Sequence, residues 1–293
     1  MGPARAGHLA MLLFSLLVAG SFALGALAAN DITPLALNTV RFWFAVVVMG
    51  VVVAMTSGFS RQAAAAPWRY VILAVFFVTY FVLMFEGLKT APPVSAAAVF
   101  TLTPILTAGF GYLLLRQMLT PRMGFALAIG AVGAVWVIFR ADIAAILRFE
   151  IGKGEWIYFW GCVGHAVYTP LVRKLNRGEP AVVFSFGVLL AGAIMLTAVG
   201  WSDLQQTVWR DLPPIVWITI GYTAVFASAA TFTLLQFATL RLPSSKVMAY
   251  TYLTPSWVIL WDVALGGAVP PMLVFLGVGL TMVALVLLLR DEG

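Results

Sequence analysis

The chain has 293 residues, of which 62% are apolar and only 10% are charged. A soluble globular domain has about 45–50% apolar and about 25% charged residues, so these figures exclude a soluble enzyme and a disordered chain. The net charge of +6 does not indicate nucleic-acid binding, because the basic residues lie in short gaps between apolar runs. A single cysteine, Cys162, excludes a disulfide scaffold.

Ten apolar segments follow one another along the chain, and a crossing of the bilayer core needs about 20 residues. They run over 8–28, 34–56, 68–88, 93–115, 121–140, 153–175, 180–200, 213–238, 244–266 and 270–290. Proline or glycine occupies most of the gaps between them. The sequence therefore predicts an all-α membrane protein with ten transmembrane helices, short connections and no room for a soluble domain.

Two stretches allow other interpretations. Arg5, the first apolar run and Ala26-Leu27-Ala28 imitate a signal peptide with its cleavage site. We expect this segment to remain as a helix, because the internal repeat described below requires it. The gap from Arg140 to Lys153 holds four large apolar residues and predicts a short amphipathic helix on the outer membrane face.

The distribution of basic residues predicts the orientation. Of the 17 Lys and Arg residues, eleven lie on the amino-terminal side of the predicted spans and one, Arg41, lies within a span. The other five lie on the opposite side: Lys89, Arg140, Arg148, Lys153 and Arg210. Because basic residues gather on the cytoplasmic side, both termini are predicted to be cytoplasmic. The expected location is the inner (plasma) membrane of a bacterium, in line with the family resemblance described below.

The two halves of the chain share motifs in the same order. Leu102-Thr103-Pro104 recurs 151 residues later as Leu253-Thr254-Pro255, and the same shift carries Pro92 onto Pro243. The sequence thus predicts two five-helix repeats, and an old duplication kept only for stability is the alternative interpretation.

The repeats are predicted to span 1–148 and 149–293. Five is an odd number, so the second repeat enters the membrane from the opposite side. Such a 5+5 inverted-topology repeat is typical of secondary transporters that bind their substrate in a central cavity between the halves.

These motifs, with Leu88-Lys89-Thr90-Ala91 and Leu119-Thr120-Pro121 beside them, resemble the drug/metabolite transporter superfamily. The resemblance is to its EamA-type tandem repeat and covers essentially the whole chain. Within the superfamily, the chain is most similar to the YddG-type exporters of aromatic amino acids. The resemblance implies ten helices, cytoplasmic termini and a cavity lined mainly by helices one, three, four, six, eight and nine.

The resemblance also bears on single positions. Arg41 stands where the family often has an arginine in its second helix. The family usually carries a Gly-Glu pair after helices four and nine. Here Arg116-Gln117 and Gly266-Gly267 occupy those places, so any role of that glutamate is absent.

Pro104 and Pro255 lie near the middle of the fourth and ninth predicted helices. Each lacks an N–H and frees the carbonyl four residues earlier, which belongs to Phe100 or Thr251. In lipid such carbonyls must face protein or a wet cavity. They are candidate acceptors for a substrate ammonium, and the prolines are candidate hinges. The alternative is a plain kink, satisfied by Thr101 or a neighbouring helix.

His165 is the only titratable residue predicted near the middle of the bilayer, about twelve residues or ~18 Å along its helix. Helical spacing places it on one face with Tyr158 and Tyr168. It is a candidate to bind a substrate carboxylate or to change protonation with pH. An interhelical hydrogen bond is the alternative.

Deep aromatic rings and hydroxyls are suited to an apolar amino-acid side chain and its charged ends. Ordinary packing is the alternative for each of them. The predicted substrate-binding set is Phe76, Tyr80, Phe100, Thr103, Trp160, His165, Tyr168, Tyr222, Tyr250, Thr251, Thr254 and Trp257.

Three charged residues fall toward the outer ends of their predicted helices: Arg41, Glu86 and Asp262. A lone charge at the bilayer centre costs about 3 kcal/mol, so partners are expected. We predict that they pair to form an outer gate when the cavity closes on the outer side. The alternative is that each reaches the interface separately.

No P-loop, HExxH or GxSxG motif is present, and two His with one Cys disfavour a metal site. The sequence predicts no enzyme and no cofactor, but a secondary transporter that exports amino acids, aromatic and other apolar ones favoured, by alternating access. The expected partners are the amino acid and the lipid bilayer. One copy is expected to suffice for transport, with dimerisation left open.

The alternatives are an exporter of another small metabolite or drug, a membrane enzyme acting on lipid and a non-transporting scaffold. For the enzyme, Glu86 with Lys89 is the only nearby candidate for a catalytic pair. The preferred amino acid and the energy coupling stay open.

Overall fold

The computed structural model describes residues 3–58, 61–148 and 150–290, and every regular element in that part of the chain is helical. The long continuous helices are α1 (Pro3–Ala28), α2 (Pro34–Met55), α4 (Trp68–Leu88), α7 (Pro121–Ile138), α9 (Lys153–Leu175), α10 (Ala181–Val199) and α16 (Val274–Arg290). Short helices join some of them: α3 (Arg61–Ala64), α8 (Ile143–Arg148) and α11 (Trp201–Gln206). The short helix predicted between 140 and 153 is thus present as α8.

Three further apolar segments form interrupted helices. Their pieces are α5 (Pro93–Phe100) and α6 (Thr103–Leu115); α12 (Pro214–Ala224), the π-helical η1 (Val225–Ala230) and α13 (Thr231–Thr239); and α14 (Ser244–Ala249), the 3₁₀-helical η2 (Tyr250–Leu253) and α15 (Thr254–Ala264). Pro104 and Pro255 each stand in the first turn of a new helix, α6 and α15. A proline is tolerated there because the N–H it lacks would have no helical partner.

Seven helices in the described part of the chain are long and apolar enough to cross a membrane: α1, α2, α4, α5–α6, α7, α10 and α12–α13. The other three predicted spans are helical but less favourable by these criteria. α9 carries charged residues at both ends, α14–α15 contains Lys246 and Asp262, and α16 has 17 residues. The predicted segments therefore match helices within a few residues, whereas ten crossings stay a prediction.

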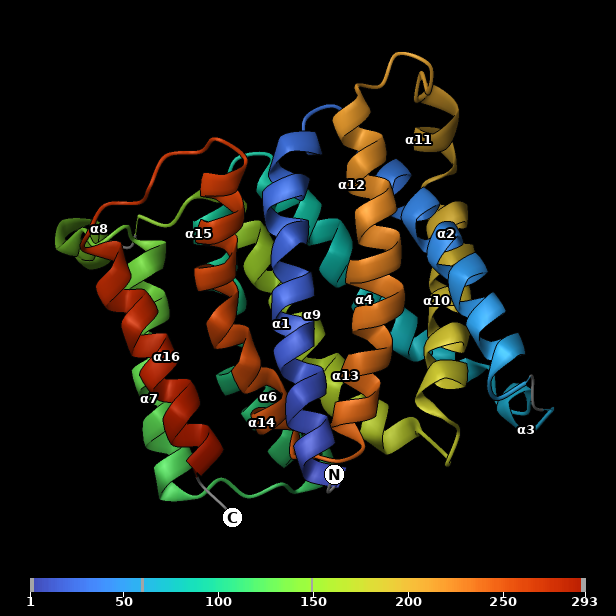
Figure 1. Ribbon diagram of the computed structural model, residues 1–293, viewed down its shortest axis with the longest axis horizontal. Coiled ribbons are helices and arrows are strands. Elements are labelled where there is room, and N and C mark those ends of the chain that lie inside the picture. Colours follow the sequence, from blue (N-terminus) through green and yellow to red (C-terminus); the bar gives the residue numbers. More distant parts are fainter. Residues whose placement is uncertain (1–2, 59–60, 149, 291–293) are drawn as a thin grey trace.

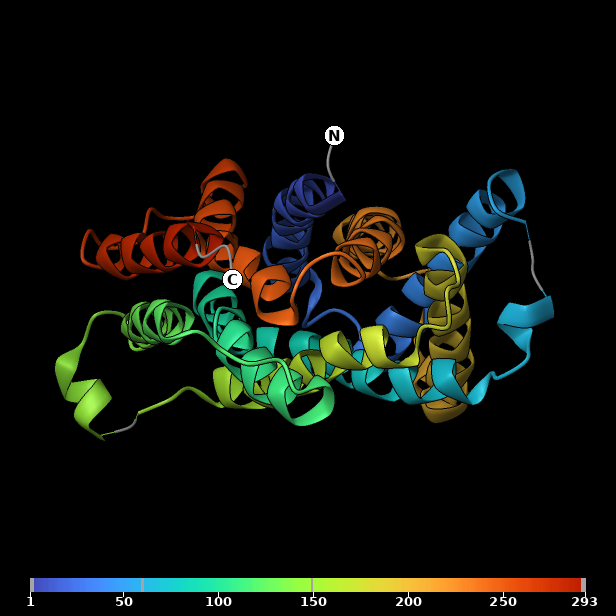
Figure 2. The ribbon, with the colours of Figure 1, turned by 90° about the horizontal axis from the view of Figure 1, so that it is seen from below.

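The helices stand side by side, and both ends of the chain lie on the same side of the bundle (Figure 1). The view from below shows an elongated bundle, with the pair α7 and α16 at one end and the pair α2 and α10 at the other (Figure 2). Between these pairs, α4 packs on α9, and α1 packs on α12 and α13. Two of the three interrupted helices, α5–α6 and α14–α15, pack against each other.

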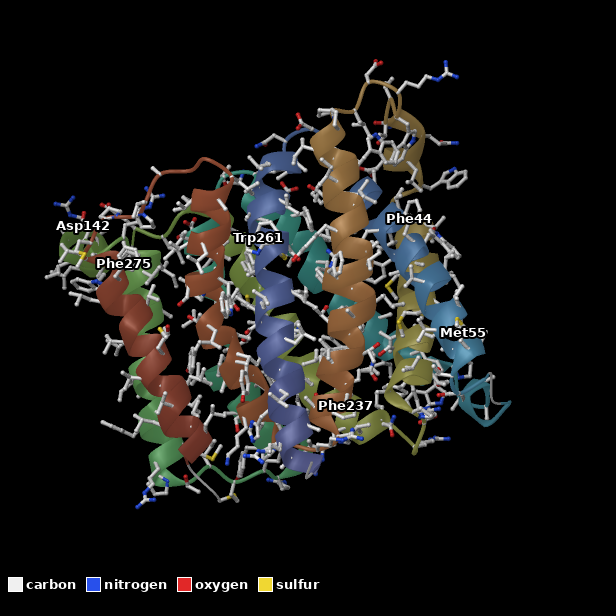
Figure 3. All side chains as sticks on the ribbon, in the orientation of Figure 1. Phe44, Met55, Asp142, Phe237, Trp261 and Phe275 are labelled. Atoms are coloured by element: carbon white, nitrogen blue, oxygen red, sulfur yellow. The ribbon has the colours of Figure 1, made fainter. Side chains whose placement is uncertain are left out.

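The outside of the bundle is apolar. Phe44 and Met55 of α2 and Phe275 of α16 are exposed, with their side chains on the outside of the bundle (Figure 3). A soluble monomer rarely exposes so continuous an apolar surface, so this surface is suited to contact with lipid tails.

Small residues bring some helices into close contact. A Cβ atom built on Gly133 of α7 would lie 2.7 Å from the carbonyl oxygen of Gly277 in α16, and the reverse distance is the same. Without a hydrophobic driving force between helices in lipid, such backbone contact is a main source of association. Gly133 and Gly277 therefore bring the backbones of α7 and α16 into direct contact.

We predict that Gly277→Ala weakens the α7–α16 pair, because the added methyl group would lie 2.7 Å from both the backbone carbonyl oxygen of Gly133 and Cγ2 of Val137. Overpacking of this kind costs about 1–3 kcal/mol, seen as a lower melting temperature of the purified protein in detergent. Gly279→Ala in the same helix is the matched control, since a Cβ there meets nothing within 4 Å. Equal melting temperatures for the two variants would contradict this account of the contact.

Candidate functional site

A cluster of aromatic rings and one imidazole fills the middle of the bundle. Its members, which we call the central aromatic cluster, are at most 3% exposed: Phe77, Tyr80 and Phe81 of α4, Phe100 of α5, His165 and Tyr168 of α9, and Phe232 of α13. The rings of Phe77 and Phe232 lie 3.8 Å apart between centroids. The cavity predicted at the centre is therefore filled by side chains in this structure.

His165 lies within this cluster and is surrounded by rings. Its centroid is 4.5 Å from that of Tyr80, 5.5 Å from Phe100 and 5.6 Å from Phe77. Its Nδ1 atom is buried and has no hydrogen-bond partner in the described part of the chain. A buried polar atom left unpaired costs about 1–3 kcal/mol, so Nδ1 is an atom that a bound substrate could satisfy.

Two polar contacts border the imidazole. The hydroxyl of Tyr158 donates to that of Tyr80 at 3.1 Å, and Gln236 of α13 donates from Nε2 to the hydroxyl of Tyr168 at 3.3 Å. The Oε1 atom of Gln236 is buried without a partner in the described residues. Sequence reasoning did not include Gln236 or Tyr158 in the site, although a glutamine within an apolar segment was an available signal.

The two Leu-Thr-Pro motifs meet beside the cluster. The hydroxyls of Thr103 and Thr251 lie 3.3 Å apart, which joins the two interrupted helices. The Thr103 hydroxyl also donates to the Phe100 carbonyl at 2.6 Å, and the backbone N–H of Thr254 donates to the Thr251 carbonyl. Both carbonyls freed by the prolines thus have partners, and neither is open to a substrate ammonium in this conformation.

Three more predicted residues lie against α1, outside the central cluster. Each makes one polar contact with that helix: the Tyr222 hydroxyl donates to the Leu17 carbonyl at 2.9 Å, Trp257 Nε1 donates to the Ser15 hydroxyl at 3.3 Å, and the Tyr250 hydroxyl lies 3.1 Å from His8 Nδ1. They therefore tie α12, α15 and η2 to α1.

Trp160, which the sequence analysis placed among the substrate-binding residues, lies outside the central aromatic cluster. Its side chain is 52% exposed and packs edge-on against Trp156 and Phe159 on the outside of α9. Phe76 is half-buried and packs against the core without joining the cluster. Both were placed in the site because of their depth along the helix, which does not say which face they occupy.

The predicted outer gate is not formed in this conformation. Glu86 forms an ion pair with Lys89 at 2.6 Å near the end of α4, and Asp262 lies half-buried near the end of α15. Among the described residues, no carboxylate lies within 4.0 Å of Arg41. The three charges therefore do not pair here, because Arg41 is turned into the bundle instead.

Arg41 is fully buried and holds on to the second half of the chain. Its Nε donates to the Ser228 hydroxyl at 2.7 Å and its Nη2 to the Ala227 carbonyl at 2.8 Å. Both acceptors belong to the π-helical segment η1. The guanidinium carbon lies 3.7 Å above the centroid of the Phe81 ring, so Arg41 borders the central aromatic cluster.

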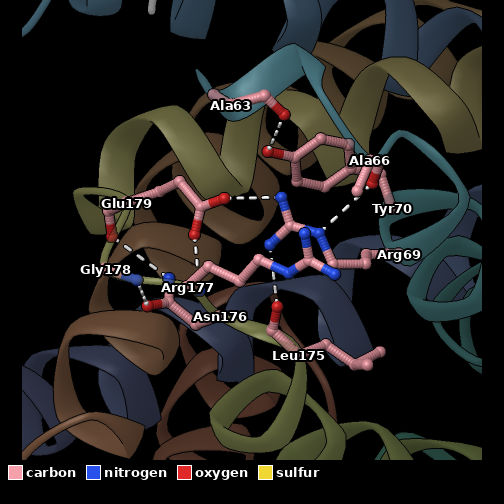
Figure 4. Close-up of polar contacts among 9 residues, drawn as sticks. All are labelled: Ala63, Ala66, Arg69, Tyr70, Leu175, Asn176, Arg177, Gly178 and Glu179. Carbon is pink, nitrogen blue, oxygen red and sulfur yellow. Dashed lines mark hydrogen bonds and ion pairs between the residues drawn. The ribbon is translucent and has the colours of Figure 1, made fainter.

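A second buried arginine ties the halves together on the side where the chain begins. Arg69, at the start of α4, donates to Glu179 Oε1 at 2.6 Å and to the Leu175 carbonyl at 2.8 Å (Figure 4). The backbone N–H of Arg177 donates to the other oxygen of Glu179 at 2.7 Å. Sequence reasoning counted Arg69 only as a marker of orientation.

Charge and hydrogen bonding decide the protonation of Glu179. Burial on its own would raise the pKa of this carboxyl. The hydrogen bonds from Arg69 and the Arg177 N–H outweigh burial and hold the pKa below its usual value. The Glu179 carboxyl is therefore ionised at neutral pH.

Comparison with known proteins points to a family of membrane transporters. The model of the EamA-like transporter family matches residues 5–139 and 152–290. A Bacillus subtilis (strain 168) protein called "Uncharacterized transporter YyaM" is 25% identical over 280 residues, covering 95% of this chain and 91% of that protein. A protein crystal structure with 20% identity superposes with a TM-score of 0.73 over 99% of both chains, which shows a shared fold.

We predict that Glu179→Gln lowers the free energy of unfolding by about 3–5 kcal/mol at pH 7, because it leaves Arg69 buried and unpaired. Glu150→Gln is the control, since its pair with Arg148 is exposed and worth about 0–1 kcal/mol. Melting temperatures in detergent measure both, and a loss no larger for Glu179→Gln than for the control would refute the prediction.

The same carboxyl predicts a pH dependence. The pKa of Glu179 is lowered on folding, so its contribution to stability is complete above the unfolded-state pKa of about 4.3. It is lost as the pH falls through the folded-state pKa. The stability difference between the native protein and Glu179→Gln should therefore shrink in acid, and a constant difference down to the folded-state pKa would contradict this.

Proposed function

The chain belongs to the EamA-like transporter family, and from that premise we propose that it exports amino acids across the inner membrane of a bacterium by alternating access. Aromatic and other apolar amino acids are the favoured substrates. The proposal includes ten spans in two inverted repeats, 1–148 and 149–293, with both termini cytoplasmic.

The packing of the helices supports the inverted repeat. A twofold axis between the repeats exchanges α2 with α10, α5–α6 with α14–α15, and α7 with α16, and each of these exchanged pairs is in contact. It also exchanges α1 with α9 and α4 with α12–α13. The contact of α4 with α9 is then equivalent to the contact of α1 with α12–α13, and both exist. The main helix contacts are thus the ones that a twofold axis between two inverted repeats would produce, which supports the proposed arrangement.

The observation that carries the substrate assignment is the central aromatic cluster. Its rings are contributed by α4 and α5 of the first half and by α9 and α13 of the second. Transporter substrates bind near the midplane between such halves. Rings suit an apolar or aromatic side chain, and the unpaired Nδ1 of His165 offers a polar contact within them.

The interrupted helices supply the proposed movement. The hydroxyls of Thr103 and Thr251 join α5–α6 to α14–α15 beside the cluster, and each of these two helices is interrupted just before its proline. Rocking one half against the other about Pro104 and Pro255 would separate the rings toward one membrane face at a time. The Arg69–Glu179 pair would then hold the bundle closed on the side of the termini.

The test is counterflow of labelled phenylalanine into liposomes that contain the purified protein, with and without a pH gradient. We predict saturable uptake that falls at least tenfold in His165→Ala, because the imidazole lies among the cluster rings. Trp160→Ala is the matched control on the same helix, and it should transport normally because its ring lies outside.

Two outcomes would count against the proposal. Uptake no greater than that of empty liposomes, with the protein shown to be folded, would exclude phenylalanine and favour another small metabolite. Equal losses in His165→Ala and Trp160→Ala would contradict the position of the site. A response to the pH gradient decides whether export is coupled to protons.

A further inference from the structure

Arg41 carries a positive charge that no carboxylate in the described part of the chain neutralises. The ion pairs among the described residues join Arg69 to Glu179, Lys89 to Glu86 and Arg148 to Glu150. Arg41 is fully buried, and removing an unpaired ion from water costs several kcal/mol. Charged residues at such a depth are usually kept for function, with a partner that can be a ligand.

The guanidinium has donors to spare. It carries five N–H groups in a planar fork. One reaches Ser228, one reaches the Ala227 carbonyl and one reaches Asn38 Oδ1 at a long 3.3 Å. Nη1 and Nη2 therefore each retain an N–H for which the described chain supplies no acceptor. Two N–H groups of one guanidinium are the donor set that a carboxylate takes, and Lys cannot reproduce it.

The surroundings of Arg41 favour a ligand between the two halves. Its acceptors lie in the π-helical segment η1 of the second half, and such interruptions occur frequently at functional sites. The ring under its guanidinium, Phe81, lies 4.8 Å from the ring of Tyr80 between centroids, and Tyr80 lies 4.5 Å from His165. A ligand bound to Arg41 would thus have its apolar part against the central aromatic cluster.

We infer that Arg41 binds the carboxylate of the substrate, with the substrate's apolar side chain against the central aromatic cluster. The inference rests on the proposed export function and narrows it to substrates that carry a carboxylate. It separates them from cationic drugs, because a second cation beside Arg41 would be repelled.

Three related probes separate the two ends of an amino acid. Phenylalanine has both charges, 3-phenylpropionate has only the carboxylate, and phenethylamine has only the ammonium. We predict that the first two raise the melting temperature of the purified native protein and that phenethylamine does not. Titrations should show at least a tenfold loss of affinity for both carboxylates in Arg41→Gln, and Arg41→Lys should recover only part of it.

The matched control is Arg210→Gln, which removes an exposed positive charge from a connection and should bind all three probes as the native protein does. If Arg41→Gln fails to fold, Ser228→Ala keeps the charge and removes its closest acceptor. That variant should still discriminate between 3-phenylpropionate and phenethylamine.

The outcomes distinguish this inference from the proposed function. A native protein that binds none of the probes and shows no counterflow overturns both. A native protein that transports phenylalanine but binds phenethylamine equally well overturns only the role of Arg41. Undiminished affinity of Arg41→Gln for 3-phenylpropionate would also overturn it.

Discussion

The absence of water in the bilayer core governs this structure, because every backbone carbonyl there must find a partner within the protein. Unbroken helices meet this requirement on their own. Here three helices are interrupted, and each interruption is satisfied in a particular way: the Phe100 carbonyl by the Thr103 hydroxyl, the Thr251 carbonyl by the Thr254 N–H, and the Ala227 carbonyl by Arg41. The polar groups that donate hydrogen bonds to these carbonyls therefore lie around the candidate site.

The sequence predicted where the helices lie along the chain, but not which side of each helix points into the bundle. Hydropathy and proline fixed where helices begin and end, since lipid requires long apolar runs and proline starts a new helix readily. Orientation around the axis needs a polar face, and helices that are apolar all round lack one. Trp160 and His165 lie five residues apart on α9, about 140° around the helix axis, so one ring lies outside and the other in the cluster. Depth along the helix, which had placed both in the site, does not distinguish these two faces.

Charged pairs were hard to predict for a related reason. Arg41, Glu86 and Asp262 share a depth, but contact also depends on which neighbour each helix faces. Glu86 finds Lys89 three residues further along, while Arg41 finds Ser228, 187 residues away. The Arg69–Glu179 pair joins residues 110 apart. No local pattern announces such contacts, because they depend on the packing of whole helices.

Under the proposed inverted repeat, the helix contacts are symmetric, but the polar residues of the candidate site are not. When the second helices of the two halves are aligned on Pro34 and Pro180, Gly187 occupies the position equivalent to Arg41. The π-helical segment that receives Arg41 belongs to α12–α13, whereas its symmetry partner α4 is continuous. Symmetric packing lets two conformations exchange the roles of the halves. A single asymmetric cation that binds a carboxylate, as proposed for Arg41, would give a substrate with unlike ends one orientation between the halves, which two equivalent charges would not do.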